Sequence, residues 1–327
     1  MMKYINKIFI LAAALIMISE YGVNAAFKEL GWSARSAGMG GAYTAVSDDS
    51  GGILYNPAGI VQVEDYEANF MYAKLFYGLD EVDLGLNYGA FLVPVADIGT
   101  FGVNWANFVS GDQYAEDILT IAYARRINDL VRKYFRKRLV PEMSFGINIK
   151  YLTHSYTLDK YAEDDPVFDD GNSSSGVALD MGLWSKPVPD LLPGFTAGLM
   201  FKNINQPDVG LNTKDPVPME LRVGLAYKER RLRRLENILT AIDLVYRNQE
   251  WGSNDDKLNL HFGLEAWVFD RLLGFRLGKN INELAAGFTI NMPEAFNLDI
   301  RLDYAFLWPC KIEETLGTHR ISFTYRF

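Results

Sequence analysis

The sequence is poor in the residues that build covalent links and catalytic sites. Its 327 residues include one cysteine, Cys310, and three histidines, His154, His261 and His319. A single cysteine excludes a disulfide within one chain, and its distance from the N-terminus excludes a lipid-attachment site there. The histidines lie on separate segments, and no serine or carboxylate pattern beside them suggests a catalytic group. We therefore expect no enzyme activity, no metal-binding residues and no cofactor.

Long apolar runs are also missing, with one exception near the start of the chain. Residues 8–18 are consecutive apolar residues that follow two lysines. Because a membrane-spanning helix needs about 20 such residues, this run is too short to be a transmembrane anchor. Val23-Asn24-Ala25 follows, with small or medium-sized residues at positions −3 and −1 before the expected cleavage site. The pattern predicts a secretory signal peptide over residues 1–25, with cleavage after Ala25 or Ala26.

An excess of basic charge is absent as well. The formal net charge is −9 and the sequence pI is about 5.0, which argues against a nucleic acid as partner. Hydrophobic residues make up 49% of the chain, yet the mean hydropathy is only −0.04. The apolar residues must therefore be distributed in a regular way.

Apolar residues alternate with polar ones over most of the chain. In the last segment Ile321, Phe323, Tyr325 and Phe327 fall on one side of an extended chain, and the residues between them fall on the other. This period of two is typical of a β-strand. The pattern recurs in about fourteen segments, near residues 66–77, 82–95, 98–109, 115–127, 140–156, 176–186, 194–204, 218–229, 236–248, 257–269, 271–279, 283–292, 296–307 and 317–327.

These strands are typical of a membrane barrel rather than of a soluble sandwich or barrel. Each is about ten residues long, the length that a tilted strand needs to cross the hydrocarbon layer. Aromatic residues lie near the strand ends, as in the interfacial girdles of membrane barrels. Because open strand edges are costly in lipid, the sheet should close. With the export signal, the pattern predicts an all-β fold, a transmembrane antiparallel β-barrel of about 14 strands surrounded by lipid of the bacterial outer membrane.

Glycine and charge occupy the face opposite the apolar one, so we expect this face to line the lumen. The glycines are Gly85, Gly89, Gly102, Gly146, Gly182, Gly198, Gly224, Gly263, Gly278 and Gly287. The charged residues are Asp180, Lys186, Lys202, Glu220, Arg222, Asp243, Arg247, Glu265, Arg276, Asp299, Arg301, Asp303 and Arg320. Because unpaired buried charge is costly, most of them should find partners across the lumen. The charges could fill the barrel as ion pairs or form a polar path or gate, and both interpretations stay open.

Two stretches resemble a known family of barrels. Residues 34–59, ARSAGMGGAYTAVSDDSGGILYNPAG, resemble the N-terminal signature of the FadL superfamily of outer-membrane barrels. Residues 316–327, LGTHRISFTYRF, are similar to the end of PorV-like sequences in that superfamily. The resemblance implies that the N-terminal segment forms a hatch inside a barrel of fourteen strands. We accordingly expect a hatch over residues 26–61 and a barrel over residues 62–327.

The glycine-rich stretch suits a hatch better than a nucleotide-binding loop. Tyr43 stands where the third glycine of a dinucleotide loop is needed, and no strand precedes the stretch. Glycine permits close approach to a crowded wall, and proline fixes the backbone. The expected hatch residues are Gly38, Gly40, Gly41, Asp48, Asp49, Asn56, Pro57 and Ala58. Lumen arginines such as Arg222, Arg301 and Arg320 should hold them.

The resemblance implies two functions. One is transport of hydrophobic small molecules across the outer membrane, which predicts an apolar pocket above Asn56-Pro57-Ala58. The alternative is a PorV-like component of a type IX secretion system that binds secreted cargo proteins, which predicts a closed lumen. In either case Phe323, Tyr325 and Phe327 resemble the C-terminal signal that the barrel-insertion machinery reads, so that machinery is an expected partner.

Overall fold

The computed structural model describes most of the chain. The described residues are 27, 29–79, 83–128, 141–160, 162, 165–169, 171–232, 235–248, 258–295, 298–312 and 314–327. The predicted signal peptide, residues 1–25, lies outside them. Within the described residues, no helix is both long enough and apolar enough to cross a membrane.

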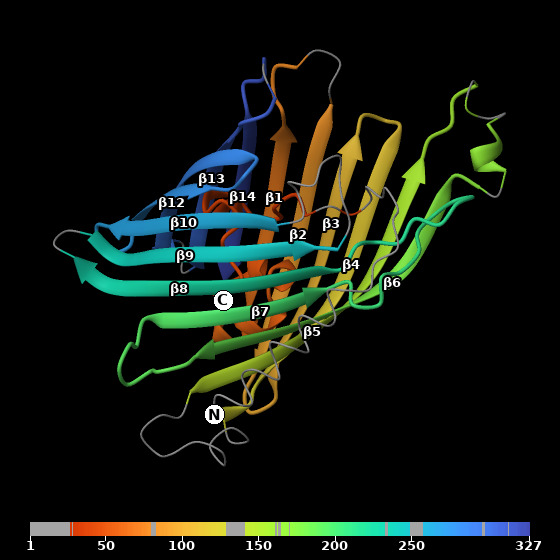
Figure 1. Cartoon of the computed structure of the whole chain (residues 1–327). Helices are drawn as coiled ribbons and strands as arrows, with labels where there is room; N and C mark the ends of the chain where they lie inside the picture. Colours follow the sequence, from red (N-terminus) through yellow and green to blue (C-terminus); the bar gives the residue numbers. More distant parts are fainter. Residues whose placement is uncertain are drawn as a thin grey trace.

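Fourteen antiparallel strands close into a barrel (Figure 1). The strands are β1 Glu67–Leu75, β2 Leu84–Val95, β3 Gly99–Ser110, β4 Tyr114–Arg126, β5 Glu142–Tyr156, β6 Ser173–Lys186, β7 Phe195–Lys202, β8 Glu220–Leu232, β9 Leu235–Arg247, β10 Leu258–Val268, β11 Leu273–Lys279, β12 Glu283–Ala295, β13 Leu298–Pro309 and β14 Thr318–Arg326. Each strand pairs with its sequence neighbours, and β1 pairs with β14 to close the sheet. The predicted barrel and its strand number are confirmed.

An even strand number places the start of β1 and the end of β14 at the same rim. In bacterial outer-membrane barrels this is the periplasmic rim, and we call the opposite end the outer rim. The hairpin of β5 and β6 projects at the outer rim in Figure 1, and the connection between these strands contains the short helix η3, Pro166–Phe168. Long outer connections and short periplasmic turns are typical of this class.

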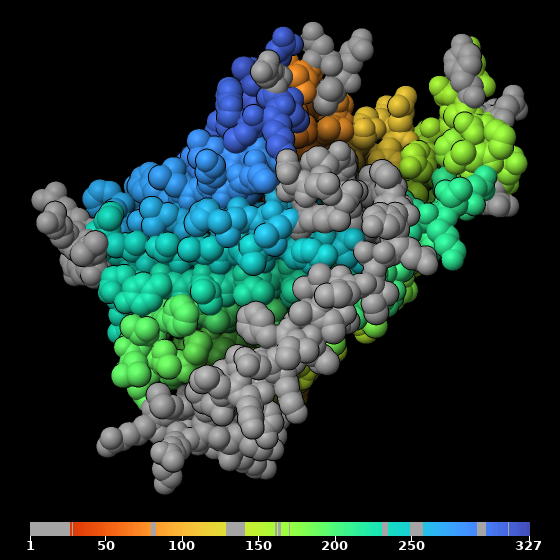
Figure 2. Space-filling view, in the orientation of Figure 1, coloured from red at the N-terminus to blue at the C-terminus, as the bar shows by residue number. Residues whose placement is uncertain are grey.

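The outer face of the wall is apolar over most of its circumference. Ile149, Leu183, Phe262 and Phe323 are among the exposed side chains of β5, β6, β10 and β14. In Figure 2 the side formed by β7 to β10 is a continuous surface. Exposed apolar side chains that alternate with buried polar ones suit a wall with lipid outside and a filled lumen inside.

The lumen has an apolar side and a charged side. Met71, Leu75, Leu86 and Leu92 of β1 and β2 belong to the main cluster of buried apolar residues. Most buried charges of the wall lie on the strands from β7 to β14, and the others are Glu67, Glu116, Lys150 and Asp180 of β1, β4, β5 and β6. One wall of the interior can therefore contact an apolar molecule while the opposite wall holds ion pairs.

The orientation of β2 corrects one expectation. Leu86, Tyr88 and Leu92 of this strand point inwards and are buried, so Gly85 and Gly89 face outwards and not into the lumen. The alternation in β2 is between apolar residues and glycine or asparagine. Such a pattern separates two faces without indicating which one meets lipid, and here the apolar face is the inner one.

Phe27 and residues 29–63 lie inside the barrel, and we call them the plug. The plug contains α2, Ala34–Gly38, and two 3₁₀ helices, η1 Ser50–Leu54 and η2 Pro57–Gln62. Helix α2 contacts β11 to β14, and η2 contacts β3 to β6. Figure 1 shows this red and orange segment within the ring of strands. The plug therefore bridges opposite walls. It overlaps the predicted hatch, residues 26–61, of which residues 26 and 28 lie outside the described residues.

Deleting Phe327 should sharply lower the amount of folded barrel in the outer membrane. Its backbone N–H donates to the Tyr66 carbonyl over 3.1 Å, and the Tyr66 N–H donates back over 3.2 Å, next to the β1–β14 pair that closes the barrel. The Phe327 ring also stacks on those of Tyr66 and Tyr325, with centroids 5.5 and 4.8 Å apart. The measurement is the heat-modifiable fraction on gels of isolated outer membranes. Wild-type amounts would contradict the role of the C-terminal residue.

Candidate functional site

Glycines of the wall form the seat of the plug. Six of them make three cross-strand pairs that face inwards, Gly146 with Gly182, Gly198 with Gly224 and Gly263 with Gly278. A Cβ atom on Gly278 would lie 2.0 Å from the Gly40 nitrogen, and one on Gly198 would lie 2.3 Å from the Thr44 carbonyl oxygen. The plug backbone therefore lies directly on the wall backbone, where no side chain fits.

The Asn-Pro-Ala step is fixed against β5 and β6. The Asn56 side-chain amide donates to the carbonyl oxygens of Thr44 and Leu183, each over 2.9 Å. Its side-chain oxygen accepts from the Ala58 N–H over 3.1 Å, which caps η2 at the position before Pro57. The Ser144 hydroxyl of β5 donates to the Ala58 carbonyl over 2.7 Å. The step thus joins two parts of the plug to the wall.

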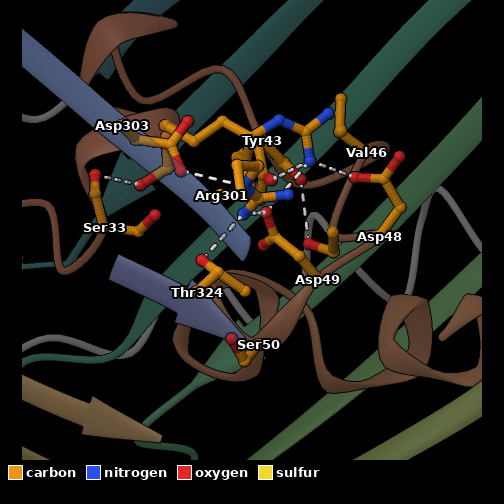
Figure 3. A network of polar contacts seen from close by, with 12 residues as sticks. Ser33, Tyr43, Val46, Asp48, Asp49, Ser50, Arg301, Asp303 and Thr324 are labelled. Atoms are coloured by element: carbon orange, nitrogen blue, oxygen red, sulfur yellow. Dashed lines mark hydrogen bonds and ion pairs between the residues drawn. The ribbon is translucent and has the colours of Figure 1, made fainter. Parts of the chain in front are cut away.

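A buried network that we call the arginine cluster holds the middle of the plug. Its members are Arg35, Asp48 and Asp49 of the plug and Glu265, Arg276, Arg301 and Asp303 of the wall. Arg35 Nε lies 2.8 Å from Glu265 Oε2, and Arg301 Nη2 lies 2.9 Å from Asp49 Oδ2. Figure 3 shows Asp49 next to Arg301, which also contacts Thr324 and Asp303. Plug and wall therefore share one set of ion pairs.

Arg35 is the residue of this cluster that the sequence analysis missed. It is the only lysine or arginine between residues 29 and 73. Its guanidinium group contacts Asp48, Asp49 and Glu265 at 2.5, 3.0 and 2.8 Å. Burial would lower the pKa of Arg35, but the surrounding carboxylates raise that pKa well above its ordinary value. A lone cation in a stretch with an aspartate pair was the available signal.

Because of the arginine cluster, the contacts that hold the plug in the lumen should depend on pH only at acidic pH. Burial by itself would raise the pKa of the Asp49 carboxyl, but Arg35 and Arg301 hold that pKa well below its ordinary value. A carboxylate with a lowered pKa stabilises the folded state above its ordinary pKa, about 3.9, and this contribution is lost as the pH falls through the lowered value.

Single-channel conductance in planar bilayers should therefore stay low and constant between pH 8 and pH 5, and rise only below about pH 4. The variant Asp49→Asn lacks the charge at every pH, so it should conduct more than the wild type already at pH 7. A rise of the wild-type conductance between pH 7 and pH 5 would contradict this account.

A second cluster holds the plug from β7, β8 and β9. Glu220 accepts from Arg247 over 2.5 Å and lies 3.5 Å from Arg222 and 3.8 Å from Lys202. Lys202 in turn pairs with Glu29 of the plug. These charges therefore tie the start of the plug to the wall as well as to one another.

Asp243 of β9 caps the plug backbone directly. One of its oxygens accepts from the N–H groups of Tyr43 and Thr44, each over 2.9 Å, and from the Thr44 hydroxyl over 2.6 Å. Arg222, 3.7 Å from the same oxygen, donates to the Gly41 carbonyl over 2.9 Å. Residues 41–44 are thus held by main-chain contacts to one carboxylate and one guanidinium.

Four of the expected lumen charges lie outside both clusters. Asp180 pairs with Lys150 over 2.7 Å, and Lys186 pairs with Glu142 over 3.3 Å. Arg320 of β14 donates to the carbonyl oxygens of Gly31 and Leu30, the latter over 2.7 Å, so it holds the plug through its backbone. Asp299 lies near the periplasmic end of β13, opposite Arg326, and joins neither cluster. Arg222, Arg301 and Arg320 all contact the plug, through Gly41, Asp49 and Gly31 respectively.

A pocket of about 540 Å³ lies at the outer end of the lumen. Its floor includes Gly31 and Tyr55 of the plug. The apolar lining includes Leu75, Phe76, Leu84 and Phe108, and the charged lining includes Arg222, Arg247 and Arg320. Asn56-Pro57-Ala58 do not line this pocket, but Tyr55, the residue before them, does.

A closed barrel of fourteen strands with a buried N-terminal plug defines the class of plugged outer-membrane β-barrels. Among solved structures, the toluene transporter TbuX of Ralstonia pickettii aligns with a TM-score of 0.57 and 12% identity, over 91% of this chain and 98% of its own. The monoaromatic hydrocarbon channel CymD aligns with a TM-score of 0.54 and 14% identity, over 92% of this chain and 99% of its own. A FadL homologue of Pseudomonas aeruginosa aligns with a TM-score of 0.55 and 13% identity, over 93% of this chain and 100% of its own.

The chain therefore has the fold of FadL-type barrels, as the N-terminal motif implied. No protein-family model matches the sequence, and no curated protein matches it. These solved structures are transporters and channels of the FadL type, so the closer resemblance to the PorV branch stays a prediction.

Proposed function

We propose that this barrel transports hydrophobic small molecules across the outer membrane and that the outer pocket is where they first bind. The observation that carries the proposal is the pocket itself, which lies between the plug and the apolar wall of the lumen. Its volume of about 540 Å³ falls in the range that small-molecule sites occupy. Leu75, Leu84 and Phe108 supply the apolar contacts that such a compound needs.

The fold supports the same proposal. TbuX is a toluene transporter and CymD a monoaromatic hydrocarbon channel, and both share this fold over nearly the whole chain. A compound of similar size and polarity would leave water for the apolar side of the pocket, and burial of its surface provides the binding energy. The plug beneath the pocket would then have to move before the compound could pass further.

A charge placed on the apolar side of the pocket tests the proposal. In Leu84→Arg, a guanidinium replaces one of the apolar contacts, so binding of the fluorescent probe 1-N-phenylnaphthylamine should weaken at least several-fold. Leu191→Arg is the matched control, because Leu191 is 70% exposed in the periplasmic turn between β6 and β7. The measurements are probe binding to the purified barrel and probe entry into cells whose outer membrane otherwise excludes it.

Equal probe binding by the wild type and Leu84→Arg would contradict a role of the pocket in transport. The protein-binding alternative gives a different result, because it expects no entry of the probe and a secreted protein that purifies with the barrel. Measurements on the same purified barrel and the same cells therefore distinguish transport from protein binding.

A further inference from the structure

The first described residue of the plug occupies a built site near the outer rim. The Phe27 nitrogen lies 3.2 Å from Glu116 Oε1, and the Tyr114 hydroxyl donates to the same oxygen over 2.8 Å. The Phe27 ring meets the His154 ring edge-on, with centroids 6.2 Å apart. Phe27 is only 9% exposed and Glu116 only 6%. A backbone nitrogen, a carboxylate and an aromatic wall thus meet where water has little access.

Glu116 needs a positive partner at this site. A buried carboxylate without a cation is costly, and within the described part of the chain no lysine or arginine side chain forms an ion pair with it. His154, its neighbour across β5, uses Nε2 for the Val209 carbonyl at 2.7 Å. Asp215 lies in the connection between β7 and β8 and carries the same sign as Glu116. An uncharged amide N–H at Phe27 would leave His154 as the basic side chain beside this carboxylate in the described part of the chain, whereas an α-ammonium group would place a full positive charge 3.2 Å from it.

The backbone at Phe27 gives a second, independent observation. Its φ angle is +59°, in the left-handed region that a bulky side chain rarely adopts. This angle exists only while a residue precedes Phe27, because φ is defined by the preceding carbonyl carbon. Cleavage after Ala26, one of the two positions that the signal sequence allows, would remove the constraint and create an α-ammonium group at the Phe27 nitrogen.

We propose that Phe27 is the first residue of the mature chain and that its α-ammonium group forms a buried ion pair with Glu116. Removal of the signal peptide then completes the seat of the plug, because it produces the cation that the carboxylate lacks. Cleavage one residue earlier would move the ammonium group by about 3.8 Å and put a neutral amide at Glu116. Glu29 and Gly31 line the pocket, so the pair also fixes the start of the pocket floor.

Processing and charge can be tested without knowing what the pocket binds. N-terminal sequencing and the intact mass of barrel purified from outer membranes should both give a chain that begins Phe-Lys-Glu-Leu. A chain that begins Ala-Phe-Lys would overturn the proposal. This first result needs no variant, so a folding failure cannot obscure it.

Amine labelling at pH 7 tests the ion pair itself. A free α-amino group has a pKa of about 7.7–8.0 and reacts before lysine side chains do, but a paired and buried group should not. We expect labelling of Phe27 in the folded wild type to be at least ten-fold slower than in the boiled protein, with exposed Lys214 as the internal reference. The variant Glu116→Gln should lose this protection, and Asp112→Asn, in the exposed turn before β4, should keep it.

Rapid labelling of Phe27 in the folded wild type would overturn the proposal, and so would full protection in folded Glu116→Gln. If Glu116→Gln does not assemble, the comparison of folded with boiled wild type decides on its own. Failure here leaves probe binding by the outer pocket untouched, so the two proposals can fail separately.

Discussion

A barrel that lacks residues 27–60 should fold, insert and conduct ions far better than the intact protein. The backbone hydrogen bonds that pair the strands lie within the wall and do not need the plug. The wall charges also keep partners when the plug is gone, because Arg276 lies 2.6 Å from Glu265 and 3.0 Å from Asp303. Deletion therefore leaves a lumen that water can fill, with ion pairs along its charged side.

The expected increase in single-channel conductance is on the order of ten-fold, because barrels of ~16 strands that lack a plug leave aqueous channels. In the truncated variant the signal peptide is joined directly to Val61. The measurement compares the single-channel conductance of the purified truncated and intact barrels in planar bilayers. Heat-modifiability on gels controls for assembly. A truncated barrel that folds and conducts no more than the intact protein would show that this segment does not close the lumen.

The strands could be predicted from the sequence because each buries one face only. Side chains in a strand alternate with a period of two, so a lipid face and a lumen face leave a visible pattern. The last strand was expected near residues 317–327 and spans Thr318–Arg326, and the first was expected near 66–77 and spans Glu67–Leu75. The same reasoning failed for the faces of β2, where Gly85 and Gly89 alternate with apolar residues that point inwards.

The contacts of the plug could not be predicted in the same way. Arg35 pairs with Glu265, 230 residues away, and Phe27 meets Glu116 across 89 residues. The alternation of side chains places a charge on the lumen face, but it does not indicate the position of that charge along the barrel axis or its ion-pair partner. The wall glycines were expected to line the lumen. That three pairs of them receive the plug backbone depends on a strand register that only the folded barrel fixes.

Replacing a single inward glycine should displace the plug without opening the wall. In Gly278→Val the new Cβ would lie 2.0 Å from the Gly40 nitrogen and 2.4 Å from the Met39 carbonyl carbon, which are backbone atoms that cannot rotate away. Valine suits a strand, so β11 itself should pair as before. The segment around Gly40 must leave its seat, and the contacts of Gly41 with Arg222 and of Thr44 with Asp243 lie next to it.

Gly89→Val is the matched control, because Gly89 faces outwards and its Cβ would lie 3.7 Å from the Phe70 ring, an ordinary contact distance. Both variants exchange the same residues within a strand and differ only in the face that receives the side chain. We expect heat-modifiable barrel in both, but a several-fold higher conductance and protease cleavage within residues 36–48 in Gly278→Val alone. If Gly278→Val conducts like Gly89→Val and protects the plug equally, the close approach of plug and wall is not what keeps the lumen shut.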